Sequence, residues 1–400
     1  MIKTVNLTDS IYYIGVNDRE TSLFENLWPL DKGVSYNSYL INDDKVAILD
    51  TVKSTKMYEF LDNIGDIIGD KQIDYLVINH MEPDHSGSIK ALLYKYPNLT
   101  IVGNKKTISI LEDFYGKFEK YLIVDDQDTL SLGKHNLKFL LTPMLHWPET
   151  MVSYEETEKI LFSMDAFGGF GALDGGIFDD EINLDFYIDE IRRYYSNIVG
   201  KYGAMVQKAL KKVTDAKIDI KTIAPTHGPV WRNNPGLIVG MYDQWSKAEA
   251  EEGVVIVYGT MYGNTQKMAE EIGRCLSEEG IKNIRIYDAS KTHVSYIISD
   301  MWKYKGVVLG SCAYNTELFP TMQNLIHKIE NSQLKNRYLG IFGTSTWSGG
   351  GVCNLEKFAE KIKWEKVGSC VEAKSSAKEK DLLLCKEIAV EMAKKLIAER

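Results

Sequence analysis

The stretch DYLVINHMEPDHSG, residues 74–87, joins a compact apolar segment to a dense group of polar side chains. Asp74–Ile78 predicts a buried strand because it is a short apolar run. Four potential metal ligands follow that strand within six residues: His80, Glu82, Asp84 and His85. Binding sites of α/β proteins lie beyond the carboxyl ends of strands, where this string begins. A polar turn before a helix near Ser86 would explain a pair of histidines, but it explains the full His-x-Glu-x-Asp-His string poorly.

Three further candidate ligands each follow a predicted strand. They are His146 after Leu137–Thr142, Asp165 after Ile160–Met164, and His227 after Thr222–Ala224. Taken singly, each could be a capping or core residue, but together with the first four they predict a metal site. The remaining histidine of this part of the chain, His135, lies in the turn-like SLGKHN and is expected to be exposed.

The composition of the chain narrows its possible functions and the kinds of metal ligand it can supply. The 400 residues are 44% hydrophobic and 26% charged, which is ordinary for a globular chain of two or three domains. The net charge of −9 argues against binding to nucleic acid or to an anionic membrane surface. All five cysteines lie at Cys275 or later and no CxxC pair occurs, so a metal site before that point must use nitrogen and oxygen ligands. The sequence shows neither a signal peptide nor an apolar run of membrane-spanning length, so a cytoplasmic location is expected.

The chain divides into two predicted domains, 1–250 and 251–400; the first is of class α/β or α+β and the second is α/β. In the first, short strands mix with helices; further strands are expected at Tyr12–Val16, Ser35–Ile41, Lys45–Asp50 and Thr100–Val102, and helices at Met57–Ile68 and Ile89–Tyr96. In the second, strands and helices alternate strictly, which is typical of a doubly wound parallel sheet. Its strands are expected at Val254–Tyr258, Ile284–Tyr287, Gly306–Leu309, Tyr338–Phe342 and Val367–Val371, with helices at Gln266–Leu276 and Lys378–Ala398.

Three loops follow strands of that parallel sheet and are rich in glycine, hydroxyl and aromatic side chains. The first loop supplies Thr260, Met261, Tyr262, Gly263, Asn264 and Thr265 at the start of a helix. The second supplies Ser311, Cys312, Ala313, Tyr314 and Asn315, and the third Ser345, Thr346, Trp347, Ser348, Gly349 and Gly350. Backbone N–H groups and hydroxyls at a helix N-terminus suit a phosphate, and aromatic side chains suit a flat ring. The arrangement resembles flavodoxin and predicts an FMN site, in which Cys312 is a lining residue because no partner histidine is evident.

The metal-ligand string resembles the metallo-β-lactamase superfamily, whose loop reads His-x-His-x-Asp-His. Glu82 stands where that superfamily has its second histidine, which is the pattern of flavodiiron proteins. The surrounding strings HWPETM, SMDAFG and THGPVW are similar to that family as well. The resemblance implies that the first domain is an αββα sandwich.

The resemblance also implies a ligand set. One iron would take His80, Glu82 and His146; the other would take Asp84, His85 and His227, although family members differ at the position of His85. Asp165 would bridge the two irons together with an oxo or hydroxo group. Oxygen-rich ligation suits iron or manganese, while affinity order alone favours zinc. Tyr195 resembles a family tyrosine just outside the ligand set, and a core aromatic on an amphipathic helix is an equally good interpretation.

The implied activity is reduction of O₂ to water, of NO to N₂O, or of both, with electrons passed through FMN. FMNH₂ and a diferrous pair hold two electrons each, which together suffice for O₂. No rubredoxin or flavin-reductase module follows the last helix, so an external donor is expected: rubredoxin or, as an alternative, reduced deazaflavin. The family resemblance implies a head-to-tail homodimer or homotetramer.

Two other functions remain open from the residues. The first is a zinc-dependent hydrolase that carries a flavodoxin domain as regulator, which Glu82 disfavours. The second is an electron carrier whose first domain is inert, against which the intact ligand set argues.

Overall fold

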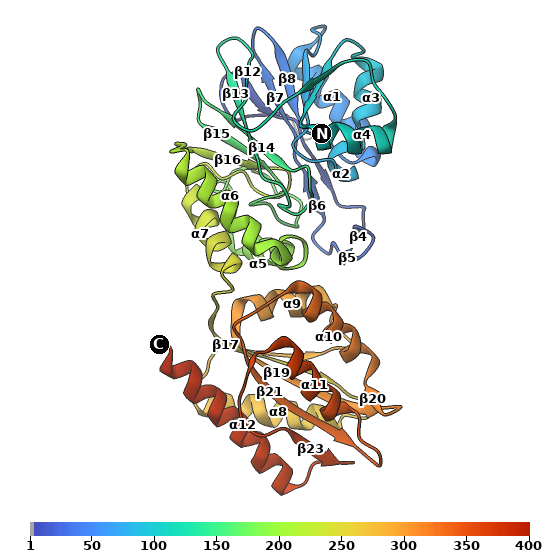
Figure 1. Ribbon diagram of the computed structural model, residues 1–400, viewed down its shortest axis with the longest axis vertical. Helices are drawn as coiled ribbons and strands as arrows, with labels where there is room; N and C mark the ends of the chain where they lie inside the picture. The colour runs from blue at the N-terminus through green and yellow to red at the C-terminus, as the bar shows by residue number, and fades with distance from the viewer. Residues whose placement is uncertain (1–3) are drawn as a thin grey trace. The chain divides into compact units, whose positions relative to one another are not determined.

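The computed structural model describes residues 4–400, which form two compact units, one up to Asp243 and one from Gln244 onward (Figure 1). Among the described residues, no helix is long and apolar enough to cross a membrane.

The first unit is built on two sheets. The larger sheet runs in the order β1 (Val5–Asn6), β2 (Ile11–Tyr13), β7 (Tyr39–Asn42), β8 (Val46–Leu49), β9 (Tyr75–Val77), β10 (Thr100–Gly103) and β11 (Tyr121–Ile123). The smaller sheet runs in the order β12 (Thr129–Ser131), β13 (Asn136–Leu141), β14 (Met151–Glu155), β15 (Ile160–Met164) and β16 (Thr222–Pro225). The sheets face one another, since the rings of Tyr39 on β7 and Phe162 on β15 lie 5.2 Å apart.

Helices and two short strand pairs complete the first unit. The helices that follow strands of the larger sheet are α1 (Met57–Ile68), α2 (Pro83–Ser86), α3 (Ile89–Lys95) and α4 (Lys105–Tyr115). Those that follow the smaller sheet's strands are α5 (Asp185–Tyr194), α6 (Gly203–Asp215) and α7 (Pro235–Ser246). The short pairs are β3 (Val16–Asp18) with β6 (Val34–Tyr36), and β4 (Leu23–Phe24) with β5 (Trp28–Pro29). This is the metallo-β-lactamase-like arrangement that the sequence predicted.

The second unit is a doubly wound sheet of flavodoxin type. Its order is β18 (Ile284–Asp288), β17 (Glu251–Gly259), β19 (Tyr304–Tyr314), β21 (Tyr338–Ser345) and β22 (Glu365–Lys366), with β23 (Val371–Lys374) also paired in parallel to β21. A short strand, β20 (Glu317–Leu318), turns back on the end of β19. The helices are α8 (Asn264–Glu278), α9 (Val294–Lys303), α10 (Pro320–Ser332), α11 (Gly351–Ile362) and α12 (Glu379–Ala398). The second strand in sequence lies outside the first and the rest follow on the other side, which is the flavodoxin order.

Several predicted boundaries are wrong, for local reasons. The expected strand Val367–Val371 is replaced by β22 and β23, because Gly368 between them has a left-handed backbone with φ of 68°. The expected strand Tyr12–Val16 divides into β2 and β3 at Gly15, where a Cβ would lie 2.6 Å from the carbonyl oxygen of Tyr36. The third strand of the parallel sheet continues as β19 to Tyr314, so much of the expected second loop is strand.

Arg337, just before β21, holds three segments of the second unit together. Its guanidinium is buried and donates hydrogen bonds to the carbonyl oxygens of Met301 and Trp302, in the last turn of α9, at 2.8 and 2.9 Å. It also donates to the carbonyl of Ala248, ahead of β17, at 2.9 Å. A cation at a helix C-terminus satisfies carbonyls that have no partner in the helix and complements the helix dipole.

Replacing Arg337 by methionine keeps much of the side-chain volume but leaves these carbonyls unsatisfied. We expect Arg337→Met to lower the free energy of unfolding of the second unit by about 3 kcal/mol. Urea unfolding monitored by circular dichroism measures the loss. The matched control is Arg274→Met on α8, whose side chain is 57% exposed and pairs with the partly buried Glu271 and the exposed Glu278, so it should cost less than about 1 kcal/mol. Equal losses in the two variants would contradict this role for Arg337.

Candidate functional site

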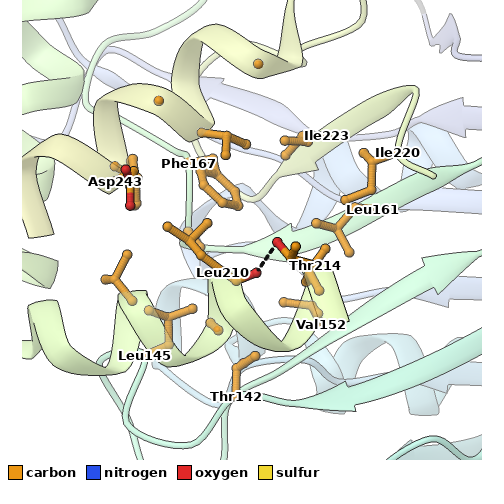
Figure 2. A pocket seen from close by; sticks show the side chains of 18 residues that line it. Thr142, Leu145, Val152, Leu161, Phe167, Leu210, Thr214, Ile220, Ile223 and Asp243 are labelled. Atoms are coloured by element: carbon orange, nitrogen blue, oxygen red, sulfur yellow. Dashed lines mark hydrogen bonds between the residues drawn. The ribbon is translucent and has the colours of Figure 1, made fainter. Parts of the chain in front are cut away.

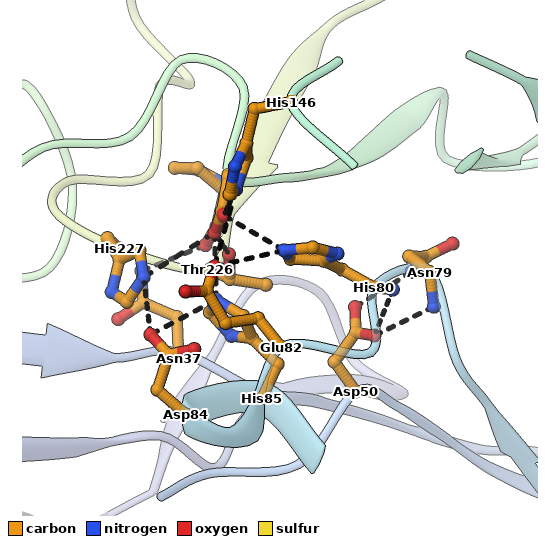
Figure 3. Close-up of polar contacts among 12 residues, drawn as sticks. Asn37, Asp50, Asn79, His80, Glu82, Asp84, His85, His146, Thr226 and His227 are labelled. Carbon is orange, nitrogen blue, oxygen red and sulfur yellow. Dashed lines mark hydrogen bonds and ion pairs between the residues drawn. The ribbon is translucent and has the colours of Figure 1, made fainter. Parts of the chain in front are cut away.

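The predicted metal ligands all lie at the carboxyl ends of strands in the first unit. His80 and Glu82 are in the loop after β9, and Asp84 and His85 are in the one-turn helix α2 that follows. Loops after β13, β15 and β16 carry the other three: His146, Asp165 and His227. Figure 3 shows the side chains from these separate loops turned toward one point.

The side chains form two adjoining groups that could each hold a metal ion. The first contains His80, Glu82, His146 and Asp165, and the second contains Asp84, His85 and His227. Within each group, the candidate ligand atoms lie within 4.8 Å of one another. In the first group, Glu82 Oε2 is 3.3 Å from His80 Nε2 and 3.4 Å from His146 Nε2. In the second, Asp84 Oδ2 is 3.4 Å from His85 Nε2 and 3.2 Å from His227 Nε2.

Asp165 lies between the groups and presents one carboxylate oxygen to each. Its Oδ2 is 2.8 Å from His146 Nε2 and 3.4 Å from His80 Nε2. Its Oδ1 is 2.8 Å from His85 Nε2 and 3.4 Å from His227 Nε2. The hydroxyl of Thr226 donates to Oδ1 at 2.8 Å, which helps to fix the carboxylate in this position.

Hydrogen bonds on the far side of two imidazoles orient them. Nδ1 of His80 lies 2.8 Å from Glu149 Oε1, and Nδ1 of His227 lies 2.7 Å from the carbonyl oxygen of Ser35. An acceptor at Nδ1 selects the tautomer whose Nε2 carries a lone pair, and in both residues Nε2 faces the centre. Glu149 Oε1 also accepts from the backbone N–H of Met81 at 2.9 Å, so one buried carboxylate fixes both a ring and its loop.

Asp50, at the end of β8, holds the start of the same loop. Its carboxylate accepts from the backbone N–H groups of Asn79 and His80, at 2.7 and 3.2 Å, and from the Asn79 side chain at 2.9 Å. Sequence reasoning gave no role to Asp50 or Glu149. Glu149 could have been identified from the sequence, because it lies three residues after His146 in the HWPETM string.

The electrostatics of the centre are dominated by burial and by close opposite charges. Burial alone would lower the pKa of His85, but the carboxylates of Asp84 and Asp165 outweigh it and raise that pKa to about 9. Burial would raise the pKa of Asp165, but the surrounding histidines hold it well below its ordinary value. The groups therefore favour carboxylate anions beside positive charge, which protons or metal ions can supply.

The residues fit a metal centre by one geometric test. Nε2 of His85 and His227 and both carboxylate oxygens of Asp84 are buried and make no hydrogen bond with any described residue. Asp84 Oδ2 nevertheless lies 3.4 Å from His85 Nε2 and 3.2 Å from His227 Nε2. Their lone pairs thus converge on a shared point instead of pairing with N–H groups, as ligands of a common cation do.

Two other residues from the sequence analysis, His135 and Tyr195, are both buried in the structure. His135 was expected to be exposed, which is wrong: it is fully buried, with Nε2 2.7 Å from Ser10 Oγ and Nδ1 2.9 Å from Glu155 Oε1. Tyr195 is also fully buried, and its ring packs edge-on against Tyr242 at 4.9 Å. The neighbouring Tyr194 has its ring 5.5 Å from that of His227.

An acidic groove of about 720 Å³ leads from the surface to the metal ligands. It is lined in part by Glu25, Tyr36, Glu82 and Asp84. Burial raises the pKa of Glu25 to about 8, and the nearby Glu82 carboxylate adds to that rise. Trp28 Nε1 donates to Glu25 at 2.8 Å and holds it in the groove.

A second site lies at the carboxyl edge of the parallel sheet in the other unit. The pocket of about 110 Å³ contains most of the predicted flavin-loop residues: Thr260, Met261, Tyr262, Asn264, Cys312, Ala313, Asn315, Ser345, Thr346, Trp347, Ser348 and Gly349. The structure adds residues that sequence reasoning missed: Thr316, Thr344 and Ser375. Ser375 could not be found from the three loops, because it follows a fourth strand, β23.

The remaining flavin-loop residues lie outside the pocket lining: Gly263, Thr265, Ser311, Tyr314 and Gly350. Ser311 is fully buried and accepts a hydrogen bond from the backbone N–H of Phe319. Thr265 Oγ1 lies 3.0 Å from Thr344 Oγ1, behind the pocket wall. Gly263 precedes α8 with φ of 82°, which favours glycine and lets the helix begin at Asn264.

The second pocket fits a flavin phosphate with an exposed ring. The side chains of Tyr262 and Trp347 are 90% and 87% exposed, although aromatic side chains of this size are normally buried. They stand beside the N-terminus of α8 and a cluster of hydroxyls, where a phosphate would bind.

Comparisons with known proteins agree with both units. The family model described as ODP family beta lactamase matches residues 34–228, and the flavodoxin model matches residues 256–388. A nitric oxide reductase from Moorella thermoacetica is 32% identical over 369 residues, covering 92% of this chain and 91% of that protein. Rubredoxin oxygen:oxidoreductase from Desulfovibrio gigas has a TM-score of 0.95 at 30% identity, with 99% of both chains covered. The flavodiiron protein from Giardia intestinalis has a TM-score of 0.93 at 29% identity, with coverages of 100% and 98%.

Glu149 provides a test of the orientation of His80. Glu149→Ala removes the acceptor for the imidazole Nδ1 and for the Met81 N–H, so we expect metal affinity to fall by roughly 10- to 100-fold. Competition between the protein and a chelator for ferrous iron, under anaerobic conditions, measures the change. Glu149→Gln retains an acceptor oxygen and should recover part of the affinity. The exposed Glu156→Ala is the matched control, and affinity in Glu149→Ala equal to that of this control would refute the role.

Proposed function

The chain belongs to the flavodiiron protein family and is an oxidoreductase, and from that premise we propose that it reduces O₂ to water, NO to N₂O, or both. The reaction would take place at a two-iron centre, with electrons passed through FMN. The observation that carries this proposal is the position of Asp165, whose two carboxylate oxygens each lie within 3.4 Å of imidazole nitrogens from a different ligand group.

The donor set is compatible with iron as the metal. It consists of imidazole nitrogens and carboxylate oxygens without any thiolate, a combination that suits iron, manganese and zinc. Glu82 makes the first group more anionic than a histidine at that position would. His80, Glu82 and His146 would hold one ion, Asp84, His85 and His227 the other, and Asp165 both. When bound, the pair of irons would supply open coordination positions and electrons for a diatomic substrate.

The protein's own residues would orient and shield the centre. Thr226 holds the Asp165 carboxylate, and Glu149 and the Ser35 carbonyl set the ring orientations of His80 and His227. Aromatic rings close one side: Phe24 lies edge-on to His227 at 5.4 Å, and Tyr194 lies at 5.5 Å. Trp147 lies edge-on to His80 at 5.3 Å. Such walls limit water at the reacting centre.

The loops of the second unit would bind FMN, which would accept electrons from a donor and pass them on. The start of α8 and the hydroxyls of Thr260 and Ser345 would surround the phosphate, and Tyr262 and Trp347 would flank the ring. Their exposure leaves the ring edge open to a redox partner. Tyr195, Gly263, Thr265, Ser311, Tyr314 and Gly350 would act as supporting residues around the two sites.

We propose rubredoxin as the electron donor, because a relative of similar structure is named rubredoxin oxygen:oxidoreductase. Reduced deazaflavin is the alternative. We further propose a homodimer or homotetramer with head-to-tail subunits, and a functional boundary between residues 1–250 and 251–400.

The proposal is tested by measuring iron, zinc and FMN in the purified protein, followed by parallel O₂ and NO consumption with reduced rubredoxin. We expect two irons and one FMN per chain, and consumption of at least one gas. Glu82→Ala should lose iron and gas reduction while the FMN absorbance stays intact, because the substitution removes a ligand from the first group only. Two zinc ions in a chain that consumes neither gas would overturn the proposal and favour a hydrolase.

A substitution at Trp347 tests the flavin site independently of the metal centre. Trp347→Ala removes an exposed ring that would stack on the flavin, so we expect FMN affinity to fall by about tenfold, which corresponds to roughly 1.4 kcal/mol. Iron content should not change. Titration of the FMN-free protein with FMN, followed by quenching of flavin fluorescence, measures the affinity. The control is Leu383→Ala, an exposed apolar residue on α12, and equal affinity in both variants would exclude Trp347 from the flavin site.

A further inference from the structure

A cavity of about 420 Å³ lies in the first unit between helices α6 and α7 and the smaller sheet (Figure 2). Its floor is formed by buried side chains from β14, β15 and β16: Val152, Leu161 and Ile223. Leu210 on α6 and Val239 on α7 lie toward its rim and are partly exposed. The cavity thus leads from the surface between two helices into the interior of the unit.

The lining is apolar almost throughout. Among the described residues that line it, Asp243 is the only one with a charged side chain, and its carboxylate accepts a hydrogen bond from Gln207 at 2.8 Å. Thr214 donates its hydroxyl to the Leu210 carbonyl, as the dashed line in Figure 2 shows. Thr142, also in the lining, is 5% exposed, and its hydroxyl has no hydrogen-bond partner among the described residues. A site of this kind suits a small apolar molecule and not an ion.

Two exposed glycines of α7 line the cavity and leave room there for a larger side chain. Gly236 and Gly240 both line the cavity and, being four residues apart, lie on one face of the helix. A Cβ added at Gly240 would meet nothing within 4 Å. Alanine at position 240 would stabilise the helix by about 1 kcal/mol relative to glycine. Gly240 therefore makes α7 less stable at a position that has room for a side chain. Apolar walls that face water are also unfavourable, which makes an unused apolar cavity of this size unexpected.

The inner wall of the cavity adjoins the metal centre through the chain itself. Leu145 directly precedes His146, and Ala166 and Phe167 directly follow Asp165. Tyr242, also in the wall, packs its ring 4.7 Å from that of Phe167. The loops that carry two of the seven candidate ligands, His146 and Asp165, therefore also form part of the cavity wall.

We propose that this cavity binds the nonpolar diatomic substrate and delivers it to the metal centre by a route separate from the acidic groove, with which it shares no lining residue. The inference rests on the proposed function, because it assigns the entry route of O₂ or NO. Both gases are uncharged and more soluble in apolar surroundings than in water. The carboxylate-lined groove favours water and cations, whereas the cavity offers apolar walls from the partly exposed Leu210 and Val239 to Leu145 and Phe167.

Xenon, an apolar gas that fills cavities of this type, provides a direct test. In crystals of the holoprotein under xenon pressure, we expect anomalous peaks within the cavity. Gly240→Phe, and independently Ala209→Phe on the facing helix α6, should abolish those peaks. Both variants should lower kcat/KM for the gas at least about fivefold while kcat at saturating gas and the iron and FMN contents stay unchanged. Gly240→Ala is the matched control and should keep the xenon peaks and kcat/KM.

The outcomes separate this inference from the proposed function. Wild-type protein that carries iron and FMN but consumes neither gas would overturn the proposed function. Active wild-type protein without xenon in the cavity would overturn the entry route alone. So would either phenylalanine variant if it loses the xenon peaks but keeps the wild-type kcat/KM. A lipid found bound in stoichiometric amount by native mass spectrometry would also overturn it, because the cavity would then be occupied by a larger apolar ligand.

Discussion

In the first unit, three carboxylates and four imidazoles converge in a buried space, where the charge of the carboxylates must be compensated. Carboxylates cannot remain charged in a low-dielectric interior without compensation. In this chain, Asp165 is nearly inaccessible to solvent and has imidazole nitrogens on both of its oxygens, while the Asp84 oxygens make no hydrogen bond with any described residue. Positive charge placed between the groups provides this compensation, and two metal ions would supply it. The loops after β9, β13, β15 and β16 bring the opposing ligands together.

The surrounding residues serve this centre by fixing directions. Asp50 holds the loop that begins at Asn79, Glu149 sets the ring of His80, and Ser35 sets that of His227. These contacts come from segments distant in sequence, so the site depends on the two sheets being packed face to face. The site of the flavodoxin-type unit is open instead of buried, because aromatic side chains and a helix N-terminus are exposed at one sheet edge. One unit is suited to binding metal and a gas, and the other to exchanging electrons with a partner.

Sequence alone predicted those parts of the fold and site that depend on local patterns. Strand β15 and helix α1 begin and end at the predicted residues, because β15 is a short, mostly apolar run and α1 has apolar residues at helical spacing. The seven candidate ligands were found because each follows a strand. Sequence could not reveal that β19 continues to Tyr314, because that extension depends on pairing with β20 and β21. His135 was misjudged for the same reason: its partners, Ser10 and Glu155, lie far away in sequence. The cavity between α6 and α7 depends on tertiary packing and was not foreseen.

The account depends most on the claim that the two ligand groups hold a pair of irons that share Asp165. Anomalous diffraction at the iron absorption edge, from crystals of the protein as purified under anaerobic conditions, tests this claim directly. Two iron peaks are predicted, one in each ligand group, with one oxygen of Asp165 bound to each. Peaks that appear at the zinc edge instead, or a single ion without contact to Asp165, would contradict the account.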